Sequence, residues 1–112
     1  MKQVRAIIRH EVLEPVRNAL EKLGVPGMTI TEVKGFGHQR GHTETYRGAQ
    51  VKIHFRPKIE LLTIINNEQL DTVVEAITTN ARTGAVGDGK IFVTSVEQVY
   101  RIRTGESGNK AI

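Results

Sequence analysis

The feature that most constrains this chain is a strand–helix–strand pattern that occurs twice in succession. In the first, apolar and β-branched residues at 3–9 and 28–33 flank a helical stretch. In the second, strands predicted at 60–65 and 91–96 flank another. A doubled β-α-β unit with antiparallel pairing in its middle predicts an α+β, ferredoxin-like βαββαβ fold. We therefore expect one domain, with a four-stranded antiparallel sheet and both helices on one face.

Both helices are predicted from apolar residues that recur along one face. The first has Pro15 in its opening turn, and Gly24 follows its last apolar residue, where a left-handed cap belongs. Either Asn66 or Asn67 is placed to cap the second helix. The two apolar stripes consist of Leu13, Val16, Leu20 and Leu23, and of Leu70, Val73, Val74 and Ile77.

The predicted strands carry apolar side chains on both faces of the sheet. Adjacent apolar pairs occur at 7–8, 61–62 and 64–65, and residues 91–93 form an apolar run. Neighbouring residues of a strand point to opposite faces, so these pairs also place apolar groups on the face without helices. Burying that face requires a partner, most simply further copies of the same chain. Homo-oligomerisation is therefore expected.

A glycine-rich stretch, Arg-Thr-Gly-Ala-Val-Gly-Asp-Gly-Lys-Ile-Phe-Val at 82–93, joins the second helix to the last strand. Three glycines within six residues allow positive φ, so backbone N–H groups can converge on an anion, and Lys90 adds a cation. A Walker-type loop instead follows a strand and opens a helix. Asp88 is expected to turn the loop rather than to act as a base. The alternative is an ordinary helix-to-strand turn that binds nothing.

Arg101 and Arg103 form a second group suited to phosphate. In an extended segment their guanidinium groups project to the same side, with a spacing that suits a polyphosphate. The alternative is a solvated basic edge. Together with Lys90 and the glycine-rich stretch, they favour an anion-binding site. The net charge of +4 agrees with anionic partners without identifying them.

Residues 34–50 contain four glycines and almost nothing that could join a core. A connection of this length in a small domain is typical of a mobile functional loop. Val51, Ile53 and Phe55 alternate with basic residues, which predicts that the chain returns as a strand, interrupted at Pro57. We therefore expect function, rather than core packing, from this part of the chain.

Several kinds of chemistry have little support in the composition. The chain has no cysteine, which excludes disulfides, thiolate zinc clusters and thiol catalysis. Of the four histidines, His38 and His42 are four residues apart, but glycines around them argue against a helix that aligns them on a metal. No Ser-His-Asp arrangement and no carboxylate pair for acid-base catalysis is apparent.

Nucleic acid and membranes are not expected as partners. RNA-binding modules of this topology stack bases on strand aromatics, and here only Phe92 is suitably placed. No apolar run reaches membrane-spanning length, and residues 1–9 lack the features of a signal peptide. We expect a cytoplasmic protein without direct membrane insertion.

Five motifs closely resemble the PII signal-transduction proteins, the nitrogen regulatory family. They are Thr-Glu-Val-Lys-Gly-Phe-Gly at 31–37, Gly-His-Thr-Glu at 41–44 with Tyr46-Arg-Gly, Ala-Arg-Thr-Gly at 81–84, Gly-Asp-Gly-Lys-Ile-Phe-Val at 87–93 and Arg-Ile-Arg-Thr-Gly-Glu at 101–106. The resemblance covers essentially the whole chain and implies a single domain, 1–112. It also implies a homotrimer with ATP or ADP in three clefts between subunits, a protruding loop at about 37–55 that docks onto target proteins, and a C-terminal segment at about 99–112.

The resemblance further implies which residues hold the ligands. It assigns the nucleotide phosphates to Gly87, Asp88, Gly89, Lys90, Arg101 and Arg103, and the surroundings of the nucleotide to Thr29, Gly35, Gly37, His38, Ile64 and Val86. Gln39 would reach the Mg²⁺ ion of the nucleotide. The effector 2-oxoglutarate would join that ion and meet Gln39, Gly41, Lys58 and Gly87. Nothing is chemically transformed in this scheme, so a regulator is expected rather than an enzyme.

The chain departs from the family pattern at several positions. Val51 and Ala49 correspond to a tyrosine uridylylated in many members and a serine phosphorylated in others, so neither modification is expected. His38 takes the place of an arginine or lysine, and Leu62 that of a glutamate near the nucleoside. These departures indicate a divergent branch of the family.

The resemblance leaves the target protein open. An ammonium channel is the leading candidate, and another transporter, such as a metal-efflux system, or an enzyme of nitrogen assimilation are the alternatives. Two rival functions remain beside the regulator: a slow ATPase or phosphotransferase that uses the same cleft, and a His-based metal sensor.

Overall fold

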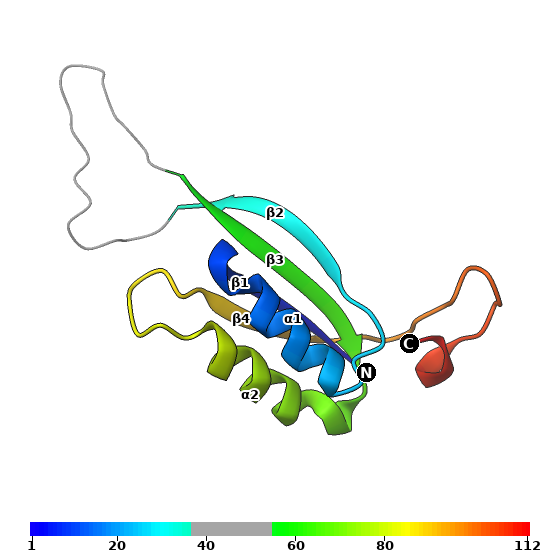
Figure 1. Cartoon of the computed structure of the whole chain (residues 1–112). Helices are drawn as coiled ribbons and strands as arrows, with labels where there is room; N and C mark the ends of the chain where they lie inside the picture. Colours follow the sequence, from blue (N-terminus) through cyan, green and yellow to red (C-terminus); the bar gives the residue numbers. More distant parts are fainter. Residues whose placement is uncertain (37–54) are drawn as a thin grey trace, which may run out of the picture.

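The computed structural model describes residues 1–36 and 55–112 as a two-layer α+β domain (Figure 1). Four antiparallel strands form one sheet in the order β2-β3-β1-β4, and two α-helices pack against it. This is the ferredoxin-like arrangement predicted from the doubled strand–helix–strand pattern. In chain order the elements are β1 (Lys2–Arg9), α1 (Leu13–Lys22), β2 (Thr29–Gly35), β3 (Arg56–Ile65), α2 (Leu70–Ala81) and β4 (Lys90–Ser95), with 3-10 helices at His10–Val12, Asn67–Gln69 and Gly108–Ala111.

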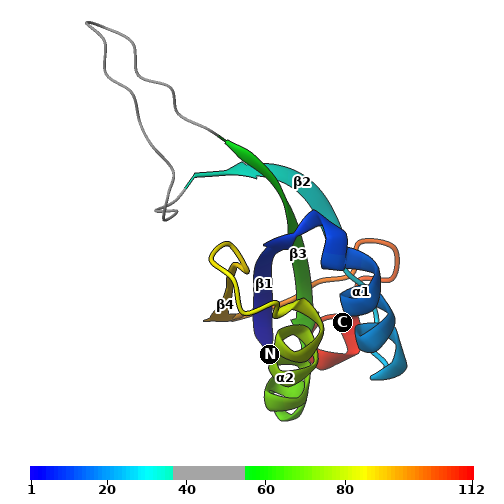
Figure 2. The same cartoon turned by 60° about the vertical axis from the view of Figure 1, so that its left-hand side comes forward.

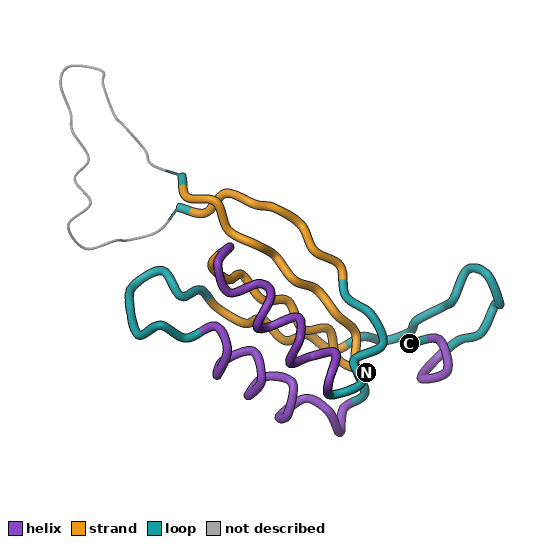
Figure 3. The backbone as a smooth tube through the Cα atoms, in the orientation of Figure 1, coloured by secondary structure: helices purple, strands orange, loops and turns teal. Residues whose placement is uncertain are grey.

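Both helices cover the same face of the sheet, as the turned view in Figure 2 and the tube in Figure 3 show. Alternate residues of the two central strands point toward the helices, where they meet the apolar stripes of α1 and α2. The most deeply buried side chains of this core are Val4, Ile8, Val16, Leu20, Ile59, Leu61, Ile65, Val73 and Ile77. Within the described residues, neither helix is long and apolar enough to cross a membrane.

The first helix ends at the glycine predicted for its cap. Gly24 has a φ of 77°, and its N–H donates to the carbonyl of Glu21 at 3.0 Å. The next N–H, that of Val25, donates to the carbonyl of Leu20 at 3.1 Å. These two bonds make a Schellman motif, which satisfies carbonyls that the end of the helix would otherwise leave unpaired.

The third strand is longer than predicted, because Pro57 does not interrupt it. β3 begins at Arg56, and Pro57 pairs in register with Lys34 of β2. On the other side, β1 ends opposite Lys58, so Pro57 has a partner strand on one side only. Proline is tolerated at such an edge-like position, because no second ladder needs its missing N–H. The interruption predicted at Pro57 is therefore wrong.

A threonine in the core layer fixes the start of β2. Thr63 of β3 is 2% exposed, and its hydroxyl donates to the carbonyl of Gly27 at 2.5 Å. A buried hydroxyl needs such a partner, because an unpaired one costs free energy. The bond ties the turn that follows α1 to the central strand of the sheet.

The face of the sheet without helices is mixed in character. Ile7, Leu62 and Ile64 are partly exposed there, and Phe92 is 42% exposed. Arg5 lies between them: its guanidinium carbon is 5.1 Å from the centre of the Phe92 ring, and its Nε is 3.6 Å from a carboxylate oxygen of Glu60. The prediction that apolar side chains occupy both faces is confirmed. We call this surface the open face.

Candidate functional site

The glycine-rich stretch forms a loop of residues 82–89 between α2 and β4. Gly84, Gly87 and Gly89 have φ values of 89°, 106° and 100°, as the sequence predicted for a loop that turns its backbone sharply. Gly89 also lies against β1, because a Cβ built on it would be 1.7 Å from the carbonyl oxygen of Ile7. No other residue type fits that position without moving the loop away from the strand. We call residues 82–89 the glycine loop.

The Asp88 carboxylate folds the glycine loop back on itself. It accepts hydrogen bonds from the N–H groups of Thr83 and Gly84 at 2.8 and 2.9 Å, and from the Thr83 hydroxyl at 2.5 Å. These bonds, the Thr83 hydroxyl first, hold the pKa of Asp88 well below its usual range. The side chain is therefore ionised at neutral pH, and it turns the loop as the sequence indicated.

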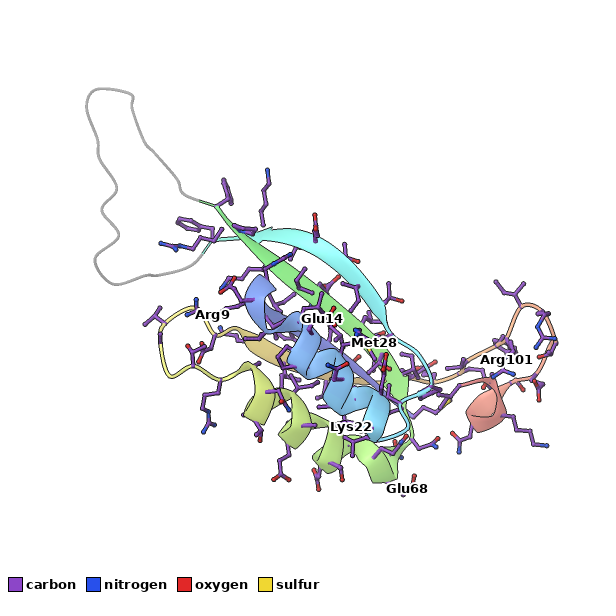
Figure 4. All side chains as sticks on the ribbon, in the orientation of Figure 1. Arg9, Glu14, Lys22, Met28, Glu68 and Arg101 are labelled. Atoms are coloured by element: carbon purple, nitrogen blue, oxygen red, sulfur yellow. The ribbon has the colours of Figure 1, made fainter. Side chains whose placement is uncertain are left out.

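Two cations from the sheet hold the other side of the glycine loop. Arg9, at the end of β1, donates to Asp88 Oδ1 from Nε at 3.1 Å and to the Val86 carbonyl from Nη2 at 2.7 Å. Lys58 of β3 donates to the Gly87 carbonyl. Burial, and then the charge of Arg9, lowers the pKa of Lys58. Figure 4 shows Arg9 reaching toward the loop from the sheet.

Two further residues predicted for the ligand site, Lys90 and Gly35, lie at this end of the sheet, whereas Thr29 and Ile64 do not. Lys90 is exposed, and its register with Ile7 puts it on the open face. A Cβ on Gly35 would be 3.3 Å from the Lys58 side chain, so the end of β2 runs directly beside that lysine. Thr29 and Ile64 lie on the open face farther along β2 and β3. The glycine loop and Lys58 thus form one end of an uncovered strip of sheet.

The two tail arginines do not lie in an extended segment. Residues 102–104 form a turn, closed by a bond of 2.8 Å from the N–H of Gly105, whose φ is 74°, to the carbonyl of Arg101. The Arg101 guanidinium donates to the Glu106 carboxylate and to a backbone oxygen of Ile112, both at 3.1 Å. The predicted parallel projection of Arg101 and Arg103 from a strand is therefore wrong, because the glycine after them closes a turn.

This turn lies far from the glycine loop of the same chain. In Figure 4, Arg101 is at one end of the molecule and Arg9 at the other, with the length of the sheet between them. The segment around Arg101 extends away from the two-layer body (Figure 1). Within one chain, the structure therefore does not bring Arg101 and Arg103 together with Lys90.

Other predicted residues lie outside the described part of the chain. These are Gly37, His38, Gln39, Gly41 and the altered modification positions Ala49 and Val51. The described residues on either side of this part of the chain pair with each other. Gly35 of β2 faces Arg56 of β3, and the centres of the Phe36 and Phe55 rings are 6.1 Å apart. Across residues 1–36 and 55–112, no group of three or more His, Cys, Asp or Glu side chains could hold a metal ion.

Arg9 and Thr83 were missed by sequence reasoning, although both contact Asp88. Thr83 carried a usable signal, because a threonine near glycines and five residues before an aspartate suits a local side-chain turn. Arg9 carried none, since 79 residues separate it from Asp88.

The whole chain is similar to known proteins. The family model "Nitrogen regulatory protein P-II" matches residues 1–106. A nitrogen regulatory protein P-II 2 of Methanothermobacter thermautotrophicus is 55% identical over 112 residues, which cover all of this chain and 97% of the relative. Nitrogen regulatory proteins P-II of Pasteurella multocida and Rhizobium meliloti are 52% and 51% identical, each with both chains fully covered. These relatives are named as regulatory proteins rather than as enzymes. The chain therefore belongs to the P-II family of nitrogen regulatory proteins.

Proposed function

We propose that this chain binds ATP or ADP, with Mg²⁺, at the interfaces of a homotrimer, and regulates target proteins through the segment at about 37–55. The binding of 2-oxoglutarate beside Mg-ATP is the second part of the proposal. Each ligand would report on the energy or nitrogen state of the cell. No step of this function changes a substrate chemically.

The observation that carries the proposal is the distance between two groups of residues suited to phosphate. The glycine loop, which Lys90 of β4 follows directly, lies at one end of the chain. Arg101, whose turn includes Arg103, lies at the other end (Figures 1 and 4). One chain cannot close both groups around one triphosphate. Two copies can, if the glycine loop of one meets residues 101–105 of the next, which we call the arginine turn. A ring of such contacts closes when the rotation between copies is regular.

The open face supports the same arrangement. Phe92 is 42% exposed and Ile102, in the arginine turn, is fully exposed. Apolar groups that remain in water cost free energy, about 25 cal/mol for each Å² that a partner would cover. A second and a third copy would cover these groups and would place the arginine turns near neighbouring loops.

The position of Lys58 supports the 2-oxoglutarate part of the proposal. Its ammonium lies at the glycine loop, beside the end of β2 that leads toward Gln39. A keto acid can chelate a Mg²⁺ ion through its carboxylate and keto oxygens, which are ligands that this ion prefers. Lys58 would then neutralise the second carboxylate, in exchange for its bond to the Gly87 carbonyl.

A mixing experiment tests whether the nucleotide site is shared between copies. Lys90→Ala and the double change of Arg101 and Arg103 to Ala should each abolish ATP binding in calorimetry, with Mg²⁺ present. When the two variants are unfolded and refolded together, about one quarter of random interfaces join an intact loop to an intact turn. We expect that fraction of the ATP sites to return. Control samples of each variant, refolded alone, should stay empty.

Two outcomes would contradict the shared site. If the mixed sample stays empty, or if the protein has the 12.4 kDa mass of one chain in light scattering, the nucleotide is not bound between copies. If ATP is hydrolysed at a rate that Lys90→Ala abolishes, the chain is an enzyme instead. Zinc binding that is lost on substitution of His38 and His42 would favour the metal sensor.

Calorimetry with 2-oxoglutarate tests the second ligand. We expect binding only after Mg-ATP is present, and a loss of that binding in Lys58→Met, which keeps the length of the side chain and removes its charge. Binding of 2-oxoglutarate without nucleotide would show that Mg²⁺ does not bridge the two ligands.

A pull-down experiment tests the target protein. We expect the unchanged chain to capture an ammonium channel. A variant in which a short glycine linker replaces residues 37–54 should not capture it.

A further inference from the structure

Two peptide groups of the glycine loop are held in one orientation by side chains that are not among those proposed to bind phosphate. Arg9 and Lys58 hold two successive carbonyl oxygens, those of Val86 and Gly87. The described chain has no cis peptide bond, and in a trans peptide the carbonyl and the N–H point in opposite directions. The N–H groups of Gly87 and Asp88 therefore point away from the two cations.

The orientation of these peptides decides which charge the loop attracts. N–H groups that face a ligand carry partial positive charge and stabilise an anion, whereas carbonyl oxygens repel it. Gly87 and Gly89 have positive φ, and glycine rotates more freely than any other residue. Without the hydrogen bonds from Arg9 and Lys58, the Val86–Gly87 and Gly87–Asp88 peptides could rotate and turn their carbonyl oxygens toward the anion instead.

The Asp88 carboxylate joins the hydrogen bonds of the glycine loop into one network. It receives Arg9 on one oxygen, at 3.1 Å, and the N–H groups of Thr83 and Gly84 on the other. The same Arg9 holds the Val86 carbonyl at 2.7 Å. The beginning and the end of the glycine loop are thus joined to each other and to β1 through a single carboxylate.

We propose that Asp88 and Arg9 are positioning residues, which fix the glycine loop so that its N–H groups face the anion. The Asp88 carboxylate does not itself contact the phosphate. This inference rests on the proposed nucleotide site, but it concerns residues that act through the loop. Under this proposal the Asp88 carboxylate strengthens the binding of Mg-ATP, whereas a negative charge beside a triphosphate would ordinarily weaken it.

The sign of one substitution separates positioning from simple electrostatics. Asp88→Asn keeps the size of the side chain and removes a negative charge, so electrostatics alone predicts tighter binding of Mg-ATP. Positioning predicts weaker binding, because the amide nitrogen of asparagine cannot accept a hydrogen bond. We expect the affinity for Mg-ATP in calorimetry to fall about tenfold, which corresponds to about 1.4 kcal/mol. Glu21→Gln, the same change in an exposed carboxylate of α1, is the matched control and should leave the affinity unchanged.

A second pair of variants leaves the charge untouched. Thr83→Ala removes the hydroxyl that donates to Asp88 and accepts from the N–H of Ala85. It should weaken Mg-ATP binding severalfold, and Thr83→Ser, which restores a hydroxyl, should recover it. Rescue by serine would not occur if threonine acted only through its methyl group. Circular dichroism confirms that each variant is folded.

Amide hydrogen exchange tests the loop without any ligand. In Asp88→Asn and in Arg9→Ala, the N–H of Gly84 should exchange at least about tenfold faster than in the unchanged protein, while amides of α1 keep their rates. The positioning role is overturned if Asp88→Asn binds Mg-ATP as tightly as the unchanged protein, or if Gly84 exchange does not change. If the unchanged protein binds no ATP, the proposed function fails, and the exchange rates alone decide whether Asp88 and Arg9 order the loop.

Discussion

Replacement of Gly89 by alanine should destabilise the fold through two separate effects. The φ of 100° is outside the range that residues with a Cβ adopt readily, which costs about 1–2 kcal/mol. The new Cβ would also be 1.7 Å from the carbonyl oxygen of Ile7, about half of an ordinary contact distance. Backbone atoms cannot turn aside as a side chain can, so the glycine loop must move away from β1. Strain of this kind adds about 1–3 kcal/mol, and we expect a total loss of about 2–5 kcal/mol.

Gly84→Ala is the matched control for that substitution. Gly84 has a similar φ of 89°, but apart from its chain neighbours no heavy atom of the described residues lies within 4 Å of the position that its Cβ would take. It should therefore show the conformational cost alone, about 1–2 kcal/mol. Urea unfolding at one fixed protein concentration measures both variants, because the stability of the proposed oligomer would depend on concentration. Each kcal/mol corresponds to about 4 °C in Tm for a chain of this size. Equal losses in the two variants would refute the argument from the contact with Ile7.

Three further changes test other parts of the structure. Leu20→Ala leaves a cavity in the core and should cost about 2–5 kcal/mol in urea unfolding; a loss below about 1 kcal/mol would mean that the core is loosely packed. Thr63→Val leaves the Gly27 carbonyl without its donor and should cost about 1–2 kcal/mol, unlike Thr63→Ser. Because the pKa of Asp88 is lower in the folded chain, its stabilisation is present above about pH 4 and is lost as the pH falls toward the folded pKa. The stability difference between the unchanged protein and Asp88→Asn should therefore narrow with acidification in unfolding curves, and a constant difference would contradict this.

The fold was largely predictable because its signals are local and periodic. The apolar stripe that contains Val16 and Leu20 and the cap at Gly24 predicted α1 within a few residues. Strand pairing followed from the order of the elements and from their short connections. Pro57 misled the prediction, because only the register shows that β1 ends opposite Lys58 and leaves the proline beside one partner strand.

The candidate site was predictable only where it depends on residues close in the chain. The positive φ angles of the glycine loop and the turning role of Asp88 follow from neighbouring glycines and threonine. The tie from Arg9 depends on β1 lying beside that loop, which no spacing reveals. The turn at Arg101 was missed, because alternating arginines suit a strand equally well. The turn forms because Gly105 adopts a φ of 74° and its N–H donates to the carbonyl of Arg101.

The paired ends of β2 and β3 have a consequence for how such a protein can diversify. Gly35 faces Arg56 in the ladder and Phe36 lies near Phe55, so the sheet brings the chain back to within one strand spacing of where it left. Doubling the number of residues between two such anchored ends costs only about 0.6 kcal/mol in closure entropy. Insertions and rewritten sequence at 37–54 are therefore cheap for the fold. Under the proposed function, substitutions at 37–54 can change which target protein is bound, while the sheet and the glycine loop stay as they are.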